Sequence, residues 1–147
     1  MGKSGESVVV DRTPEEVYRY VADLRNEPNW HVDIASVPAE TDPVPVVGKT
    51  SAVKFKPFMG KTEGTFTVVE AEPGARVVYR ADFAGLRPKI TYTVEPVAGG
   101  ARFTRSVEMR GTGVRVLMAP LMAPLMALMV PRRNKVFVEN LKRALET

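Results

Sequence analysis

Arg105 is the side chain whose position in the sequence points most clearly to chemistry. Residues 101–110 alternate between apolar and polar, and side chains two apart on a strand lie on the same face. The face that carries Arg105 is otherwise apolar and holds Phe103, Val107 and Met109. A guanidinium on an apolar face is costly unless a partner compensates it. The position therefore indicates a ligand contact or a structural pairing.

Two roles for Arg105 are open. In the first, its guanidinium orients a ligand carboxylate or polarises a ligand carbonyl toward an enolate. In the second, it reaches the sheet edge or pairs with a structural carboxylate such as Asp82 or Glu63. The sequence favours neither role over the other.

Two tyrosines share the predicted interior with Arg105. Tyr79 and Tyr92 take inward positions on neighbouring predicted strands and bring hydroxyl groups into an apolar space. Each hydroxyl has two readings: a hydrogen bond to a ligand carbonyl, or a hydrogen bond to a backbone carbonyl, which is the more usual fate of a buried tyrosine.

His31 is the sole histidine, and the sequence has no cysteine. These counts argue against a histidine or thiolate metal site and against a Ser–His–Asp triad, so we expect neither a metal nor a cofactor. His31 has a functional reading, as a general base at a pocket mouth beside Trp30. The more ordinary reading, which we favour, is a hydrogen-bonded loop residue near a helix break.

The composition of the chain is typical of a globular protein. Of its 147 residues, 44% are hydrophobic and 26% are charged, which favours one domain over residues 1–147. The net charge of +4 is spread along the chain, so we expect a solvated surface rather than a nucleic-acid site. The first residues form no apolar signal segment, which favours a cytoplasmic location.

The N-terminal part predicts a strand followed by a helix. Residues 7–11 are rich in β-branched side chains, as a first strand would be. Thr13 can cap a helix that has proline at its first position, and Glu16 completes a capping box. Apolar residues at helical spacing predict that this helix ends near Arg25, with a break or short helical turn over 26–30.

From residue 34 to residue 111 the period changes to two, which indicates strands. The predicted strands cover 34–40, 51–58, 61–72, 76–83, 88–96 and 101–110. Short connections rich in glycine and proline separate them, so we expect antiparallel hairpins rather than crossover helices.

The segment 114–130 is almost wholly apolar and holds four of the seven methionines. We expect it to be part of a long C-terminal helix with a kink at Pro131. It is shorter than the roughly 20 residues that a membrane span needs, and Pro120 and Pro124 interrupt it, so no span is expected. If its apolar face is exposed, homodimerisation or docking onto a partner or membrane surface becomes an alternative.

These elements predict an α+β fold in which a curved antiparallel sheet wraps around the long C-terminal helix. A sheet of this length twists and curls, and pockets form where a helix lies against it. Strand and helix periodicity, together with Trp30 beside the helix break, give the expected ligand-binding residues: Trp30, Phe55, Phe66, Tyr79, Phe83, Tyr92, Arg105, Met109, Met118, Met122 and Leu125.

Several stretches of sequence resemble the START-like (SRPBCC) superfamily, which includes polyketide cyclases and dehydrases. Its opening helix is matched by Thr13-Pro14-Glu15-Glu16-Val17-Tyr18 and Ala22-Asp23-Leu24, its tryptophan marker by Pro28-Asn29-Trp30, and its last two strands by 92–97 and 99–104. The resemblance implies a helix-grip fold of about seven strands, with one or two short helices after the first strand. It also implies an apolar pocket that different relatives use for lipids, polyketides, sterols, quinones or hormones. The proline-interrupted, methionine-rich final helix departs from the family pattern.

Two functions fit these observations best. The first is binding of a small hydrophobic molecule, such as a lipid or polyketide, between the sheet and the C-terminal helix. The second is a polyketide cyclase or dehydratase activity in the same cavity, for which the candidate catalytic residues are Arg105, Tyr79, Tyr92 and His31. Binding is the first hypothesis, because the predicted interior contains few acid–base groups.

Overall fold

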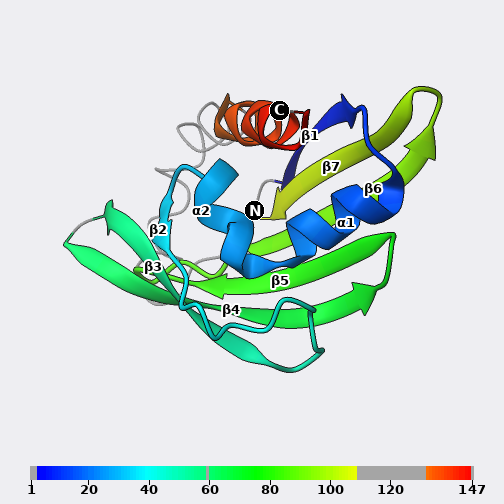
Figure 1. The fold of residues 1–147 in the computed structure, drawn as a ribbon. Coiled ribbons are helices and arrows are strands. Elements are labelled where there is room, and N and C mark those ends of the chain that lie inside the picture. Colours follow the sequence, from blue (N-terminus) through cyan, green and yellow to red (C-terminus); the bar gives the residue numbers. More distant parts are fainter. Residues whose placement is uncertain (1–2, 59, 109–131, 147) are drawn as a thin grey trace.

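The computed structural model describes residues 3–58, 60–108 and 132–146. The seven strands formed by these residues belong to one antiparallel sheet, in the order β1-β7-β6-β5-β4-β3-β2. The strands are β1 (Lys3–Val10), β2 (Ile34–Ser36), β3 (Thr50–Phe58), β4 (Lys61–Glu72), β5 (Arg76–Asp82), β6 (Lys89–Val97) and β7 (Gly100–Glu108). The sheet curves, and α1, α2 and the C-terminal helix over residues 132–146 lie on its concave side (Figure 1). The predicted helix-grip architecture is confirmed.

Helix α1 (Pro14–Ala22) begins as its sequence predicts. The Thr13 hydroxyl accepts from the Glu16 backbone N–H, and the Glu16 carboxylate accepts from the Thr13 N–H, which completes the capping box. The helix ends three residues before the predicted Arg25. Asp23 takes an extended conformation there, and its carboxylate accepts from the Arg25 backbone N–H. This local hydrogen bond starts a new 3-10 turn, η1 (Leu24–Asn26), in place of continued α-helix.

The short helix α2 (Glu27–Trp30) follows η1 directly. His31 caps its C-terminus, and the His31 N–H donates to the Glu27 carbonyl at 2.7 Å. This element occupies the predicted helix break. It matters for the site because it places the side chains of Glu27, Trp30 and His31 on the concave side of the sheet, where all three are buried.

The strands from β3 to β7 match their predicted ranges closely, whereas the two edge strands differ. β2 is shorter than 34–40, because Pro38 has no N–H to continue a ladder. β1 starts four residues before the predicted strand, since its polar first half pairs with β7 from Lys3↔Glu108 onward. The first half of this edge strand is held by backbone hydrogen bonds to β7. Its sequence has no alternation of apolar residues from which the strand could be predicted.

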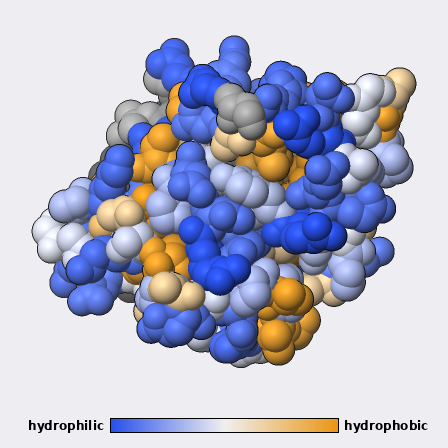
Figure 2. All heavy atoms as spheres, in the orientation of Figure 1, coloured by the Kyte–Doolittle hydropathy of each residue, from blue (hydrophilic) through white to orange (hydrophobic). Residues whose placement is uncertain are grey.

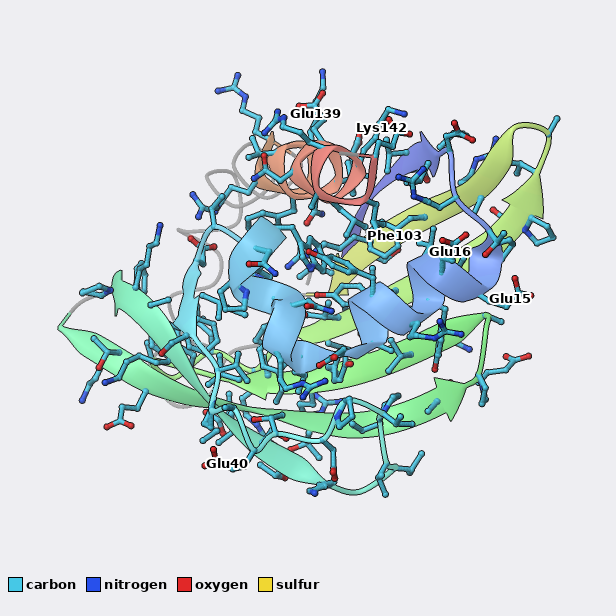
Figure 3. The ribbon with its side chains drawn as sticks, in the orientation of Figure 1. Glu15, Glu16, Glu40, Phe103, Glu139 and Lys142 are labelled. Atoms are coloured by element: carbon cyan, nitrogen blue, oxygen red, sulfur yellow. The ribbon has the colours of Figure 1, made fainter. Side chains whose placement is uncertain are left out.

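The core lies between the concave face of the sheet and the helices. Alternation along β7 buries Ala101, Phe103, Arg105 and Val107, as predicted. Phe103 points from β7 toward the helices, whereas Glu139 lies on the outer side of the C-terminal helix (Figure 3). The face shown in Figure 2 is mainly hydrophilic, with separate apolar patches.

One glycine, Gly64 in β4, is required by a close approach. A Cβ atom at this position would lie 2.6 Å from the Phe55 ring and 2.7 Å from the Asp82 carbonyl oxygen. Phe55 in turn stacks on Phe83, with ring centroids 4.1 Å apart. The absence of a side chain at Gly64 therefore lets Phe55 of β3 and Phe83, which follows β5, place their rings together.

We expect Gly64→Ala to destabilise the protein by roughly 1–3 kcal/mol, because neither the ring nor the carbonyl can move freely. Chemical denaturation measures the change. The adjacent exposed residue provides a control, since Glu63→Ala should alter the free energy of unfolding by less than about 0.5 kcal/mol. Equal effects of the two substitutions would show that the close packing around Gly64 does not contribute to stability.

Candidate functional site

A cavity of about 470 Å³ lies between the sheet and the first turns of the described part of the C-terminal helix. Its sheet wall is apolar and consists of Phe55, Phe66, Ala81, Phe83, Ile90 and Val107. His31 and Asp33, after α2, and Arg133, Asn134 and Phe137 of the C-terminal helix also line it. The remaining lining residues are Lys56, Pro57, Phe58, Leu86 and Pro88, together with Arg105.

The cavity has an exposed rim and a buried end. Phe58 is 42% exposed, and Lys56 and Pro57 are exposed beside it. At the rim Arg133 forms a salt bridge with Asp33, and both side chains keep more than two fifths of their surface exposed. Arg105, by contrast, is 4% exposed. A molecule in the cavity would therefore meet water at the rim and a guanidinium in the buried part of the lining.

Neutral groups surround the guanidinium of Arg105. Its Nη1 donates to the side-chain oxygen of Asn134, and its Nη2 lies 3.2 Å from His31 Nε2. Its central carbon lies 4.4 Å from the centroid of the Phe137 ring, over which the cation is attracted by the ring face. Each contact supplies an acceptor or a π face, but none supplies a negative charge.

The alternative pairing of Arg105 with Asp82 or Glu63 is wrong. Asp82 is exposed and forms an ion pair with Arg87, with 3.7 Å between Nε and Oδ2. Glu63 is exposed as well. Arg105 does not extend to a sheet edge either, because β7 lies between β1 and β6. Both carboxylates are exposed, whereas the guanidinium of Arg105 is buried.

His31 lines the cavity and is held in a defined chemical form. Guanidinium groups only donate hydrogen bonds, so Nε2 must accept from Arg105 and the proton must sit on Nδ1. Burial, followed by the charges of Arg105 and Arg133, lowers the pKa of His31 well below its usual value. The ring stacks on Phe137, with centroids 4.4 Å apart. His31 is therefore neutral, with its basic nitrogen already engaged.

Three of the predicted site residues lie behind the cavity rather than on its wall. Trp30, Tyr79 and Tyr92 are fully buried, and none is among the residues that line it. The Tyr79 hydroxyl donates to the Ala22 carbonyl at 3.2 Å, the backbone partner that is usual for a buried tyrosine. Trp30 packs against Tyr92 and Phe103, with centroid separations of 5.3 and 5.8 Å.

The structure adds a buried carboxyl group that the sequence analysis missed. Glu27 is 0% exposed, and the Tyr92 hydroxyl donates to its Oε1 at 2.8 Å. Burial raises the pKa of Glu27 to about 8, although the Tyr92 hydrogen bond and the Arg105 charge act in the opposite direction. The available signal was spacing, because a residue three before Trp30 and four before His31 shares their helix face.

The other predicted site residues divide into two groups. Phe55, Phe66 and Phe83 line the cavity together with Arg105 and His31. Met109, Met118, Met122 and Leu125 fall outside the described residues, as does the predicted kink at Pro131.

The described residues form neither a metal-ligand cluster nor a membrane-spanning helix. Within residues 3–58, 60–108 and 132–146, no three histidine, aspartate or glutamate side chains gather as metal ligands would. No helix in the described part of the chain is long and apolar enough to cross a membrane.

The high pKa of Glu27 predicts a specific pH dependence of stability. Between pH 4.5 and about 8, the unfolded chain has lost this proton while the folded protein keeps it, so stability falls as pH rises. The slope is at most about 1.4 kcal/mol per pH unit. We expect Glu27→Gln to remove this slope between pH 6.5 and 8, a range above the usual pKa of histidine, as measured by urea unfolding.

The matched control is Glu139→Gln, which changes an exposed glutamate on the outer side of the C-terminal helix (Figure 3). This variant should keep the wild-type slope. If the free energy of unfolding of the wild type did not change from pH 6.5 to 8, Glu27 would not be protonated in the folded protein, and its raised pKa would be wrong.

Solved structures similar to this chain show the same fold at low sequence identity. The di-domain ARO/CYC BexL from the BE-7585A biosynthetic pathway has a TM-score of 0.77 and 20% identity, over 99% of this chain and 47% of that chain. Protein CV1439 from Chromobacterium violaceum has a TM-score of 0.67 and 21% identity, over 100% and 99% of the two chains. The Aha1 dimer from Colwellia psychrerythraea has a TM-score of 0.66 and 20% identity, over 99% and 97%.

No curated protein matches this chain. A family model does, and it extends over residues 1–146, almost the whole chain. The sequence match and the seven-stranded sheet that grips a C-terminal helix agree. The chain belongs to the polyketide cyclase / dehydrase and lipid transport family.

Proposed function

We propose that this protein binds a small, mainly apolar molecule in the cavity between the sheet and the C-terminal helix. The observation that carries the proposal is the pairing of an apolar wall with one buried guanidinium at its inner end. A volume of about 470 Å³ lies within the range of roughly 300–1,000 Å³ that is usual for small-molecule sites.

The physical basis of binding is the removal of apolar ligand surface from water. Each Å² of apolar area that leaves water contributes about 25 cal/mol before the costs of association. The aromatic side chains Phe55, Phe66 and Phe83 supply much of the surface that such a ligand would contact. Arg105 supplies the directional contact that fixes which end of the ligand enters first.

A second candidate is catalysis of the cyclase or dehydratase type. It is favoured by the buried Glu27–Tyr92 pair, which holds a proton near neutral pH close to Arg105. Cyclisation or dehydration of a β-keto chain needs proton transfer and stabilisation of an enolate, and a guanidinium serves the second need. Binding ranks first, because Glu27 and Tyr92 do not line the cavity and the basic nitrogen of His31 is engaged with Arg105.

The proposal predicts that filling the cavity abolishes binding. Ala81 is buried and lines the cavity, so Ala81→Leu places a larger side chain where the ligand would lie. We expect at least tenfold weaker binding of the fluorescent fatty acid 11-(dansylamino)undecanoate, measured by titration. The control Ala52→Leu makes the same change at an exposed position on β3 and should bind as the wild type does.

Thermal unfolding confirms that both leucine variants are folded before the titrations are compared. Unchanged affinity in a folded Ala81→Leu protein would contradict binding in this cavity. Mass spectrometry of organic extracts from the purified wild-type protein would then identify the natural occupant, because an apolar ligand held in such a site is expected to survive purification.

A further inference from the structure

The charge of Arg105 is unusual because it is buried without an ion pair. Among the described residues, no carboxylate forms a salt bridge with this guanidinium. Its two hydrogen-bonding partners, Asn134 and His31, are both neutral, and Phe137 offers only its ring face. A buried charge without a counterion is costly, and the cost is relieved when an anion reaches it.

The buried carboxyl group of Glu27 is not a counterion for Arg105, because it forms no hydrogen bond with the guanidinium. Glu27 has Oε1 engaged by the Tyr92 hydroxyl, and its Oε2 has no hydrogen-bond partner among the described residues. Glu27 also stands behind the cavity wall, whereas Arg105 lines the cavity itself. A ligand in the cavity therefore meets the guanidinium directly and meets no buried carboxylate of the described residues.

The one acidic side chain among the lining residues, Asp33, is neutralised at the rim. The carboxylate of Asp33 is paired with Arg133, which lies on the same side of the cavity. Lys56 adds a further cation to the lining. The charged groups that face the cavity therefore carry an excess of positive charge from its mouth to its buried end.

We infer that the cavity selects apolar molecules that carry a carboxylate, and that Arg105 binds this carboxylate at the buried end. This inference rests on the proposed function and narrows its ligand class. A carboxylate suits the planar guanidinium, which can donate two parallel hydrogen bonds to it. Asn134, His31 and Phe137 act as positioning residues, because they fix the plane of the guanidinium from three directions.

The test compares carboxylates with matched neutral alcohols on the wild-type protein. Isothermal titration calorimetry at pH 7 measures decanoate against decan-1-ol, and 2-naphthoate against 2-naphthalenemethanol. We expect each carboxylate to bind at least tenfold more tightly than its alcohol. The two pairs also distinguish aliphatic from aromatic ligands, since the better-bound pair shows which body fits the cavity.

Two variants assign the preference to Arg105. In Arg105→Met the carboxylate preference should disappear while alcohol binding remains. The control Lys54→Met removes one exposed positive charge from β3 outside the cavity and should keep the preference. Because Arg105→Met removes a buried anchor and can fail to fold, the wild-type titrations are also repeated in 0.5 M NaCl. Salt screens exposed cations strongly and buried pairs weakly, so the preference should persist.

The outcomes separate the inference from the proposal on which it rests. Equal affinity for carboxylates and alcohols would overturn the inference and leave cavity binding intact. A preference that vanishes in 0.5 M NaCl, or that survives in folded Arg105→Met, would also overturn it, because surface cations would then be its source. If none of the four compounds binds, the proposed function itself fails.

Discussion

The structure of this site depends on how one buried positive charge is accommodated. Arg105 lies on the inward face of β7, where alternation of the strand places it among apolar neighbours. Its contacts come from separate parts of the chain: His31 at the end of α2, and Asn134 and Phe137 on the C-terminal helix. The guanidinium therefore connects the sheet, the short helices and the C-terminal helix at one point. The part of Arg105 that these contacts do not cover lines the cavity.

Behind that point the interior is organised in two layers. The layer that lines the cavity contains Phe55, Phe66 and Phe83 and accepts a ligand surface. The layer behind it contains Trp30, Tyr79 and Tyr92. The Tyr79 hydroxyl donates to the backbone carbonyl of Ala22, and the Tyr92 hydroxyl donates to the Glu27 carboxyl. Burial keeps the pKa of Tyr92 well above its usual value, so its hydroxyl remains a donor to Glu27. This separation explains how the fold holds Glu27 and the two tyrosine hydroxyls in its core while most of the sheet side of the cavity stays apolar.

Local sequence patterns predicted the strands and the wall better than they predicted polar partners. The range of β4 and the inward face of β7 follow from alternation, and the start of α1 follows from Thr13 and Glu16. The partners of Arg105 could not be found in this way, because His31 and Asn134 are separated from it by 74 and 29 residues. Glu27 was missed because a glutamate beside proline resembles loop sequence, and its partner Tyr92 on β6 lies 65 residues away in the chain.

The most direct test of the account is a crystal structure of the protein with 6-bromo-2-naphthoate. The anomalous signal of bromine locates the apolar body, and the electron density of the carboxylate shows which end is buried. The account predicts bromine toward the rim near Phe58 and the carboxylate within hydrogen-bond distance of Arg105. Bromine at the buried end with the carboxylate in solvent, or an occupied site elsewhere with this cavity empty, would contradict it.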